Sequence, residues 1–342
     1  MSIKNFLRRK SGVALLHAAV TAGVLALIGV GSAQAQYTTV NDPNIEPGTG
    51  WISGISGSTV SYFGYDLSSN YIAQTYNGST FTSIQGFTNL ETLTSGSAIV
   101  GHTVDGISYG SYASGSNTVG YTWDGTTLVT IDNPNNTATD NQLTVGAQGG
   151  NIYGNYTPTD LTVGSAGYIY NGSTFTSLYD PLQGSIGLGT VITGVNSTNI
   201  YGGYYDNSGI EQGFIYNGSS FQTISDPNAV NATVVFGTDG NNIVGTYYDG
   251  YGYQHGFVYN TITTTYTTLD DPLSSLLAGG TYVTGISGNL VVGNYYDSVT
   301  GLANGFSYEI NSTPSTPEPG SLALLAGLGI AGAGFVRKRR NR

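Results

Sequence analysis

The chain has 342 residues, among them 52 glycines and 27 tyrosines, and it contains no cysteine. All 9 lysine and arginine residues lie close to the two ends, so the 20 aspartate and glutamate residues leave the central part strongly acidic. This balance excludes nucleic acid as a partner, because binding of a phosphate backbone needs lysine or arginine. The absence of cysteine excludes disulfides, thiol chemistry and cysteine-based metal sites.

Residues 1–35 have the three parts of a secretory signal peptide. Four basic residues lie within the first ten, an apolar stretch follows from about residue 13 to 30, and Ala33 and Ala35 form a small-x-small cleavage site. We therefore predict that the chain is exported and cleaved after Ala35. A permanent N-terminal membrane anchor is the alternative.

Between residues 37 and 310 the sequence repeats. A motif of glycine, aromatic, any residue and aromatic occurs at residues 120–123, 167–170, 213–216, 256–259 and 305–308, and a weaker copy ends at Tyr76. The last aromatic residues of successive copies are 47, 47, 46, 43 and 49 residues apart. Repeats of this length that are rich in glycine and aromatic residues are typical of short strands joined by tight turns.

Each repeat is predicted to contain four strands. An apolar strand that meets a glycine comes first (191–195), a second strand follows a short turn (200–206), the Gly-aromatic motif is the third, and an alternating strand ends the repeat (221–224). Between the third and fourth strands, an Asn-Gly or Asp-Gly pair predicts a two-residue hairpin turn. Four short antiparallel strands per repeat are typical of a β-propeller blade.

The last repeat lacks a fourth strand of its own. Residues 37–43 instead match residues 266–272, which end a complete repeat. The N-terminal strand should therefore complete the last blade and close the ring, which removes two open sheet edges. We predict an all-β, six-bladed β-propeller of ~46-residue four-stranded repeats over residues 37–310, with a linear β-solenoid as the alternative.

The repeat also resembles a bacterial family of secreted proteins with so-called HAF repeats. The matching residues are 293–297 and 255–259, followed by Asp271-Pro272. This resemblance implies a secreted, propeller-like module, and it implies no particular reaction.

The chain ends in a second three-part segment. Residues 311–319 form a proline-rich linker, residues 320–336 are apolar and uncharged, and a basic cluster follows. At ~1.5 Å per residue, a helix of this length would span roughly 26 Å. We predict that residues 320–342 are a transmembrane helix with a basic tail on the cytoplasmic side. The residues that define this segment are Pro317, Glu318, Pro319, Arg337, Lys338, Arg339 and Arg340.

This arrangement resembles the PEP-CTERM sorting signal of Gram-negative bacteria. The resemblance implies that an exosortase-type membrane protease recognises the tail and cuts near Pro-Glu-Pro. The protein would be anchored transiently in the inner membrane and then reach the cell surface or the extracellular matrix. Such signals accompany exopolysaccharide production, and a permanent C-terminal anchor is the alternative.

A Tyr-Tyr-Asp triplet ends the second strand in three repeats. One interpretation is a ring of aromatic and carboxylate groups that binds sugar or Ca²⁺. The other, which we favour, is aromatic packing between blades with each aspartate forming an Asx turn. Adjacent strand residues face opposite ways, so one tyrosine of each pair could face a ligand. The candidate ligand residues are Tyr205, Asp206, Tyr248, Asp249, Tyr296 and Asp297.

No catalytic, cofactor or metal site is predicted. His102 and His255 are the two histidines outside the signal peptide, which excludes a three-histidine zinc site. The aspartates near the ends of the fourth strands are interpreted as turn caps rather than calcium ligands, because calcium needs six to eight oxygens from a compact loop. These aspartates are Asp132, Asp180, Asp226 and Asp271.

We therefore predict an exported, non-catalytic surface or extracellular-matrix protein that acts as an interaction or glycan-binding module, with exopolysaccharide as a candidate partner. The alternative is a polysaccharide-active hydrolase or lyase built on a propeller. It requires two carboxylates that converge at one mouth of the channel.

We expect the protein recovered from cells or medium to have an intact mass that fits residues 36 to about 319. Trypsin should leave that mass unchanged, because residues 36–336 contain no lysine or arginine. A mass that retains the basic tail would instead identify a permanently anchored protein.

Overall fold

The computed structural model describes residues 37–94, 98–104, 106–115, 117–136, 142–159, 164–184 and 189–310. The predicted signal peptide, with Ala33 and Ala35, and the predicted sorting segments 311–319 and 320–342 lie outside these residues. Residues 39–310 form one compact unit. In the described part of the chain, no helix is long and apolar enough to cross a membrane.

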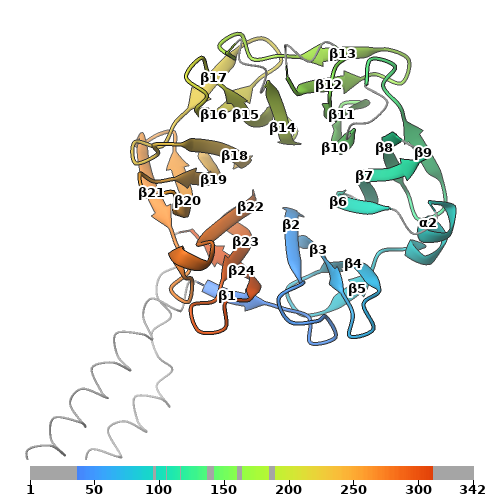
Figure 1. Cartoon of the computed structure of the whole chain (residues 1–342), viewed down its shortest axis with the longest axis horizontal. Coiled ribbons are helices and arrows are strands. Elements are labelled where there is room, and N and C mark those ends of the chain that lie inside the picture. The colour runs from blue at the N-terminus through green and yellow to red at the C-terminus, as the bar shows by residue number, and fades with distance from the viewer. Residues whose placement is uncertain are drawn as a thin grey trace, which may run out of the picture. The chain divides into compact units, whose positions relative to one another are not determined.

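The strands form a ring around a central opening, with one strand of each group innermost (Figure 1). The inner strands are β2 (Trp51–Ser56), β6 (Ile99–Val104), β10 (Leu143–Gln148), β14 (Thr190–Val195), β18 (Ala232–Asp239) and β22 (Thr281–Ser287). The second strands are β3 (Thr59–Tyr65), β7 (Ile107–Ser114), β11 (Asn151–Tyr156), β15 (Ile200–Tyr205), β19 (Asn242–Tyr248) and β23 (Leu290–Tyr296).

The remaining strands lie farther from the opening. The third strands are β4 (Tyr71–Tyr76), β8 (Asn117–Trp123), β12 (Ala166–Tyr170), β16 (Glu211–Tyr216), β20 (Gln254–Asn260) and β24 (Ala303–Glu309). All but β4, the weaker copy, carry the Gly-aromatic motif. The outer strands are β5 (Phe81–Ser83), β9 (Leu128–Ile131), β13 (Phe175–Leu178), β17 (Phe221–Ile224), β21 (Thr265–Leu269) and β1 (Tyr37–Val40). Two short helices, α2 (Phe87–Leu93) and the 3₁₀ helix η2 (Leu276–Ala278), lie in connections between strands.

The strands pair in five sheets. Four are separate four-stranded sheets, β2–β5, β6–β9, β10–β13 and β22–β24 with β1, whereas β14–β21 form one eight-stranded sheet. The all-β propeller is thus confirmed, but the expectation of six separate blades is corrected, because four blades stand alone. The two halves of the large sheet meet through one parallel pair, Glu211 with Ala232. Neighbouring strand groups are close enough at the starts of these strands for their backbones to pair. Ser165 and Gly189, which directly precede β12 and β14 respectively, form another such parallel bridge.

The N-terminal strand closes the ring. β1 pairs with β24, the last strand of the domain, so the sheet that contains β22 has both ends of the described chain. A buried cluster of Val40, Ile52, Tyr62 and Val292 then joins this sheet to β2 and β3. This arrangement excludes the linear solenoid.

The connection between the third and outer strands differs from the predicted two-residue hairpin. Tyr76 pairs with Phe81, so four residues form the loop. Asn77 Oδ1 accepts hydrogen bonds from the N–H groups of Ser79 (3.0 Å) and Thr80 (2.9 Å), and of this Asn-Gly pair only Gly78 has a positive φ. The asparagine thus forms an Asx turn instead of adopting the left-handed conformation that a type I′ turn requires.

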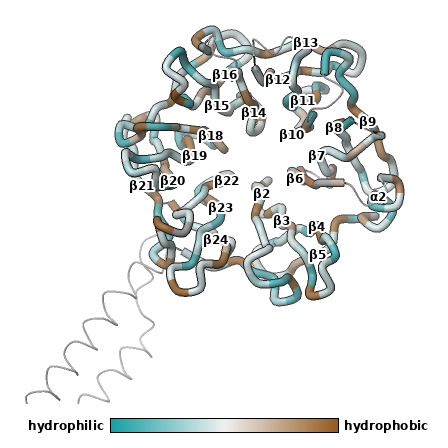
Figure 2. The backbone as a smooth tube through the Cα atoms, in the orientation of Figure 1, coloured by the Kyte–Doolittle hydropathy of each residue, from teal (hydrophilic) through white to brown (hydrophobic). Residues whose placement is uncertain are grey.

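The glycine of the Gly-aromatic motif makes room for the next strand group around the ring. A Cβ atom added at Gly167 would lie 2.7 Å from Ile192 Cδ1, and one at Gly305 would lie 2.8 Å from Ile52 Cδ1. The aromatic residue that follows is fully buried, as Tyr168 and Phe306 show. The motif therefore packs an aliphatic side chain of one inner strand against the third strand of its neighbour. Along the ring, apolar and hydrophilic residues alternate over short distances (Figure 2).

Two asparagines on second strands add a polar clamp at these junctions. Asn294 donates from Nδ2 to the Ile52 carbonyl (2.8 Å), and its Oδ1 accepts the Ile52 N–H (2.8 Å). Asn155 holds the backbone of Ile192 in the same way, at 2.6 and 2.7 Å. The Asn294 clamp lies where the last strand group meets the first.

We expect Asn294→Ala to lower the free energy of unfolding by about 2–4 kcal/mol, because it leaves a buried N–H and a buried C=O of Ile52 without partners. Urea unfolding followed by circular dichroism measures this loss. Asn241→Ala, at an exposed turn position, is the matched control and should stay within about 0.5 kcal/mol of the parent. Equal midpoints for the two variants would show that the clamp does not hold the ring closed.

Candidate functional site

The first tyrosine of each Tyr-Tyr-Asp triplet is structural. Tyr204, Tyr247 and Tyr295 are buried. Their hydroxyl groups pair with threonine hydroxyls on the outer strands of their own groups, at 3.1 Å to Thr223 and 3.0 Å to Thr268 for the first two. These contacts tie the second strand to the outer strand across the third.

The second tyrosine of each triplet faces the other side of the sheet and is half-buried. Tyr248 lines a central cavity, and the Tyr296 ring lies 6.4 Å from that of Trp51, which lines the same cavity. The Tyr205 hydroxyl donates a hydrogen bond to the carboxylate of Glu211. Of the three predicted tyrosines, Tyr248 therefore lines the cavity itself. Tyr205 and Tyr296 each lie beside a side chain that lines it, Glu211 and Trp51 respectively.

The predicted aspartates make turns. Asp206 Oδ1 accepts the N–H groups of Ser208 (2.8 Å) and Ile210 (3.1 Å). Asp249 and Asp297 bind the backbone of the turns that follow them in the same manner. These hydrogen bonds stabilise the ionised form, so the pKa of each carboxyl lies below its ordinary value. Among the described side chains, no group of three or more histidine, aspartate or glutamate residues is arranged to hold a metal ion.

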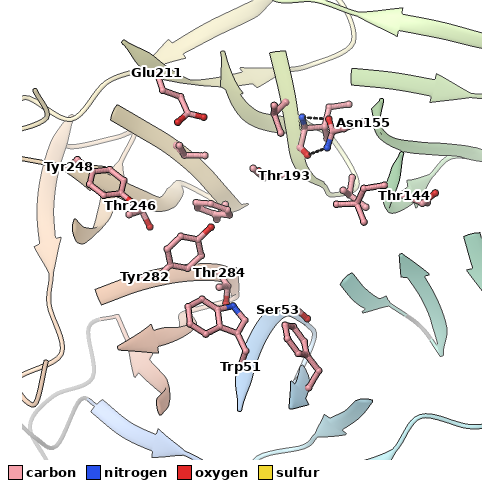
Figure 3. Close-up of a pocket in the computed structure, with 17 residues that line it drawn as sticks. Trp51, Ser53, Thr144, Asn155, Thr193, Glu211, Thr246, Tyr248, Tyr282 and Thr284 are labelled. Carbon is pink, nitrogen blue, oxygen red and sulfur yellow. Dashed lines mark hydrogen bonds between the residues drawn. The ribbon is translucent and has the colours of Figure 1, made fainter. Parts of the chain in front are cut away.

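The cavity lies among the inner strands and has a volume of about 490 Å³. Figure 3 shows its lining side chains converging on one space from several strand groups. Five are aromatic: Trp51, Phe63, Phe236, Tyr248 and Tyr282. Polar groups are supplied by Ser53, Thr144, Asn155, Thr193, Glu211, Thr246 and Thr284.

The aromatic side chains form a continuous wall across the point where the ring closes. The Tyr282 ring centre lies 5.8 Å from that of Trp51 and 4.8 Å from that of Phe236, with tilted planes. Tyr282, Trp51 and Phe236 come from β22, β2 and β18. Residues from the beginning and from the later part of the domain therefore build one surface. Burial raises the pKa of the Tyr282 hydroxyl, which therefore stays protonated near neutral pH.

Of the residues that line the cavity, Tyr248 is a site residue predicted from the sequence, whereas the aromatic wall and the carboxylate of Glu211 were missed. Glu211 begins β16 and lies beside Gly203, whose added Cβ would be 2.8 Å from Glu211 Oε1. Gly203 faces the motif glycine of its third strand, the same position that Asn155 and Asn294 occupy in their groups. The missing side chain leaves space for the Glu211 carboxylate where two of the other groups have an asparagine clamp.

The environment of Glu211 disfavours its charge. Burial raises the pKa of the carboxyl, and the hydrogen bond from Tyr205 opposes this rise in part. The signal in the sequence was a glycine, Gly203, at the second-strand position where the other repeats have Phe63, Ser111, Asn155, Thr246 and Asn294, together with a glutamate two residues before the motif glycine. That these two exceptions in one repeat lie side by side is visible only once the register of the strands is known.

The two histidines outside the predicted signal peptide lie in different strands. His102 lies in β6. His255 is buried, with Nδ1 2.8 Å from Asp270 Oδ2 and Nε2 3.6 Å from Asp249 Oδ2. Its ring stacks on Tyr247 at 4.9 Å. His255 does not line the cavity, and its contacts hold the third strand against neighbouring loops.

The aspartates after the outer strands cap turns, as interpreted from the sequence. The Oδ1 atoms of Asp180, Asp226 and Asp271 each accept an N–H two residues on, at 2.8 Å. In the second repeat this role belongs to Asn133 rather than to Asp132, because the Asx turn starts one residue later. Burial raises the pKa of all three aspartates.

Comparison with known proteins identifies a sorting motif near the end of the chain. Residues 315–340 match the PEP-CTERM protein-sorting motif, which marks the chain as exported and sorted at a membrane. No curated protein matches the sequence.

Three solved structures resemble the domain in part. The SapL1 lectin in complex with alpha methyl fucoside is 14% identical, with a TM-score of 0.44 over 79% of this chain and 95% of that one. The β-propeller domain of the Trilobed protease from Pyrococcus furiosus is 10% identical, with a TM-score of 0.47 over 78% and 81%. The fungal lectin from Aleuria aurantia, a six-bladed propeller, is 14% identical, with a TM-score of 0.42 over 78% and 95%.

We expect the melting temperature of the domain to be highest at a mildly acidic pH. Burial raises the pKa values of Asp180, Asp226, Asp271 and Glu211 in the folded domain. The domain therefore loses stability as the pH rises through these raised pKa values. The turn aspartates with lowered pKa values act in the opposite sense, and their contribution is lost below about pH 3.9. Melting curves between about pH 4 and 8 measure this optimum.

The triple variant Asp180→Asn, Asp226→Asn and Asp271→Asn is the control, because asparagine can keep the Asx turn, as Asn133 does. It should melt higher than the parent at neutral pH and show a flatter pH profile. A parent whose melting temperature rises steadily toward alkaline pH would contradict the assignment.

Proposed function

We propose that this exported propeller is a non-catalytic glycan-binding module and that its ligand enters the central cavity. The observation that carries the proposal is the aromatic wall of Trp51, Tyr282 and Phe236 facing a set of hydroxyl and amide groups. The apolar face of a sugar ring stacks on aromatic side chains, while its hydroxyls need polar partners of this kind. The cavity volume of about 490 Å³ lies in the range of small-ligand sites.

The same cavity favours binding over hydrolysis. Glycoside hydrolysis uses two carboxyl groups that flank the scissile bond. Among the described residues that line the cavity, Glu211 is the one carboxylate. The hydrolase or lyase hypothesis remains testable, because it predicts that a bound polymer becomes shorter.

We propose further that an exosortase-type protease processes the sorting motif and that the mature domain acts at the cell surface or in the extracellular matrix. The match of residues 315–340 supports this route. Exopolysaccharide is the proposed polymer, because the domain would share its compartment. Deletion of residues 315–340 should leave the protein at the inner membrane or in the periplasm. Unchanged delivery to the cell surface would contradict the proposal.

We also propose that the ring is best counted as six blades. Within the eight-stranded sheet, a Cβ atom added at Gly213 would lie 3.0 Å from Val235 Cγ2, which repeats the contact of Gly167 with Ile192 between separate sheets. The link between its halves is a single backbone pair. An experimental structure in which β16 and β18 pair along their whole length would contradict this count.

Intrinsic fluorescence tests the binding site. The chain has 2 tryptophans; Trp123 is 1% exposed, whereas Trp51 lines the cavity. We expect oligosaccharides from the host exopolysaccharide to change the emission of the mature domain. Trp51→Phe should abolish that change, and Trp51→Ala should weaken binding about tenfold or more, since stacking and burial of an aromatic ring contribute on the order of 1.4 kcal/mol.

Polymer size after incubation separates the two hypotheses. If the polymer binds and keeps its length, the binding module is supported. If it is shortened, the enzyme hypothesis replaces it. If neither the polymer nor its fragments change the Trp51 emission or bind in a pull-down, the cavity is not a glycan site.

A further inference from the structure

The Glu211 carboxylate lies in the cavity without a cationic partner. From residue 37 to 310 the sequence contains no lysine or arginine, and the ion pairs of the described residues both belong to His255. The one hydrogen bond described for the carboxylate comes from the Tyr205 hydroxyl. A buried carboxylate loses favourable hydration, and a nearby positive charge would offset that loss.

The position of Glu211 is particular to one strand group. At the same place on the third strand, two residues before the motif glycine, the other groups have Tyr71, Thr118, Ser165, Gln254 and Ala303. Only the group that carries Glu211 also has a glycine, Gly203, at the facing clamp position. The space at Gly203 and the carboxylate of Glu211 thus occur in the same strand group. Together they form an acidic recess of the cavity at one junction of the ring.

Aromatic rings border this recess. The hydroxyls of Tyr205, Tyr248 and Tyr282 are near enough to Glu211 for its charge to raise their pKa values, although burial is the larger cause. Figure 3 shows Glu211 and Tyr248 on one side of the cavity, with Tyr282 and Trp51 beyond them. The faces of tyrosine and tryptophan attract cations, so carboxylate and rings favour the same kind of ligand group.

We propose that the cavity selects sugars that carry a free, protonated amino group, with the ammonium bound to Glu211 and the sugar ring against Trp51 and Tyr282. This inference rests on the proposed glycan-binding function and names the class of its ligand. An N-acetylated sugar with the same ring presents a neutral amide in place of the ammonium. It therefore loses the ion pair with the carboxylate and keeps at most a hydrogen bond from its amide N–H.

The test compares glucosamine oligomers with N-acetylglucosamine oligomers of equal length, by calorimetry and Trp51 fluorescence on the mature domain. A pH of about 6 keeps most of the sugar amine charged, because an amine beside electron-withdrawing groups titrates near the value of about 7.7 of an α-amino group. We expect the free amines to bind at least about tenfold more tightly, because hydrogen bonds between charged groups are roughly twice as strong as neutral ones. Glu211→Gln should bring the ratio of the two affinities close to one.

Long-range attraction of cations by the acidic domain needs its own control. Glu46→Gln removes the same charge from an exposed side chain and should leave the ratio of affinities unchanged. If Glu46→Gln lowers the ratio as much as Glu211→Gln does, general charge attraction explains the preference and the proposal is wrong.

Gly203→Asn supplies an independent variant. No backbone obstacle lies within 3.4 Å of the added Cβ, whose near neighbours are atoms of the Glu211 side chain. The asparagine should displace Glu211 and clamp the backbone of the next inner strand, as Asn155 and Asn294 do. We expect a higher melting temperature together with loss of the preference for amines. A preference that survives this variant would contradict the role of the recess.

The outcomes separate the two proposals. Equal binding of both oligomers to the parent domain would overturn the selection of amino groups and leave the glycan-binding function intact. Binding of neither oligomer, with no binding of host polysaccharide, would overturn both. Tighter binding of the amines that depends on Glu211 but not on Glu46 would support both.

Discussion

The contact between one inner strand and the third strand of its neighbour is the constraint on which this structure depends. In five strand groups a glycine stands where the third strand faces the neighbour, and an added Cβ would clash with Ile192 at Gly167 and with Ile52 at Gly305. The first group has the small residue Ala73 at this position. Close packing of this kind tolerates little change in volume. The contact repeats around the ring, and at its last copy it joins the end of the domain to its beginning, which places Trp51 against Tyr282. The cavity is therefore a product of ring closure.

The domain is held together almost without ion pairs. From residue 37 to 310 there are 19 carboxylates and no lysine or arginine, and the described ion pairs both involve His255. Hydrogen bonds to backbone N–H groups take the place of salt bridges, as at Asp206 and Asp226. A carboxylate that accepts such bonds is stabilised in its ionised form without a cationic partner. Glu211 differs from these aspartates, because its carboxylate accepts a single described hydrogen bond and faces a cavity.

One exception to the repeat creates the candidate site. In two other groups Asn155 and Asn294 occupy the position of Gly203, and their amides hold the next inner strand by its backbone. Gly203 has no side chain to make such a clamp, and the space that it leaves is entered by the Glu211 carboxylate. Functional sites often depart from the local rules that stabilise the rest of a fold.

The sequence by itself determined the repeat, the all-β propeller, the N-terminal strand as the partner of the last group, and the sorting motif. Each of these depends on local spacing: a period of about 46 residues, glycine beside aromatic residues, and a matching strand at residues 37–43. The Asn-Gly pairs predicted the place of the turns but not their length, because the asparagine side chain binds the backbone and forms a four-residue Asx turn. Only the tertiary structure decided that β14–β21 share one sheet and that the triplet aspartates are used in turns. It also decided that Glu211, Trp51 and Tyr282, from three distant parts of the chain, line one cavity. The physical reason is that strand register and ring closure set which side chains meet, and neither is expressed in the spacing of any single repeat.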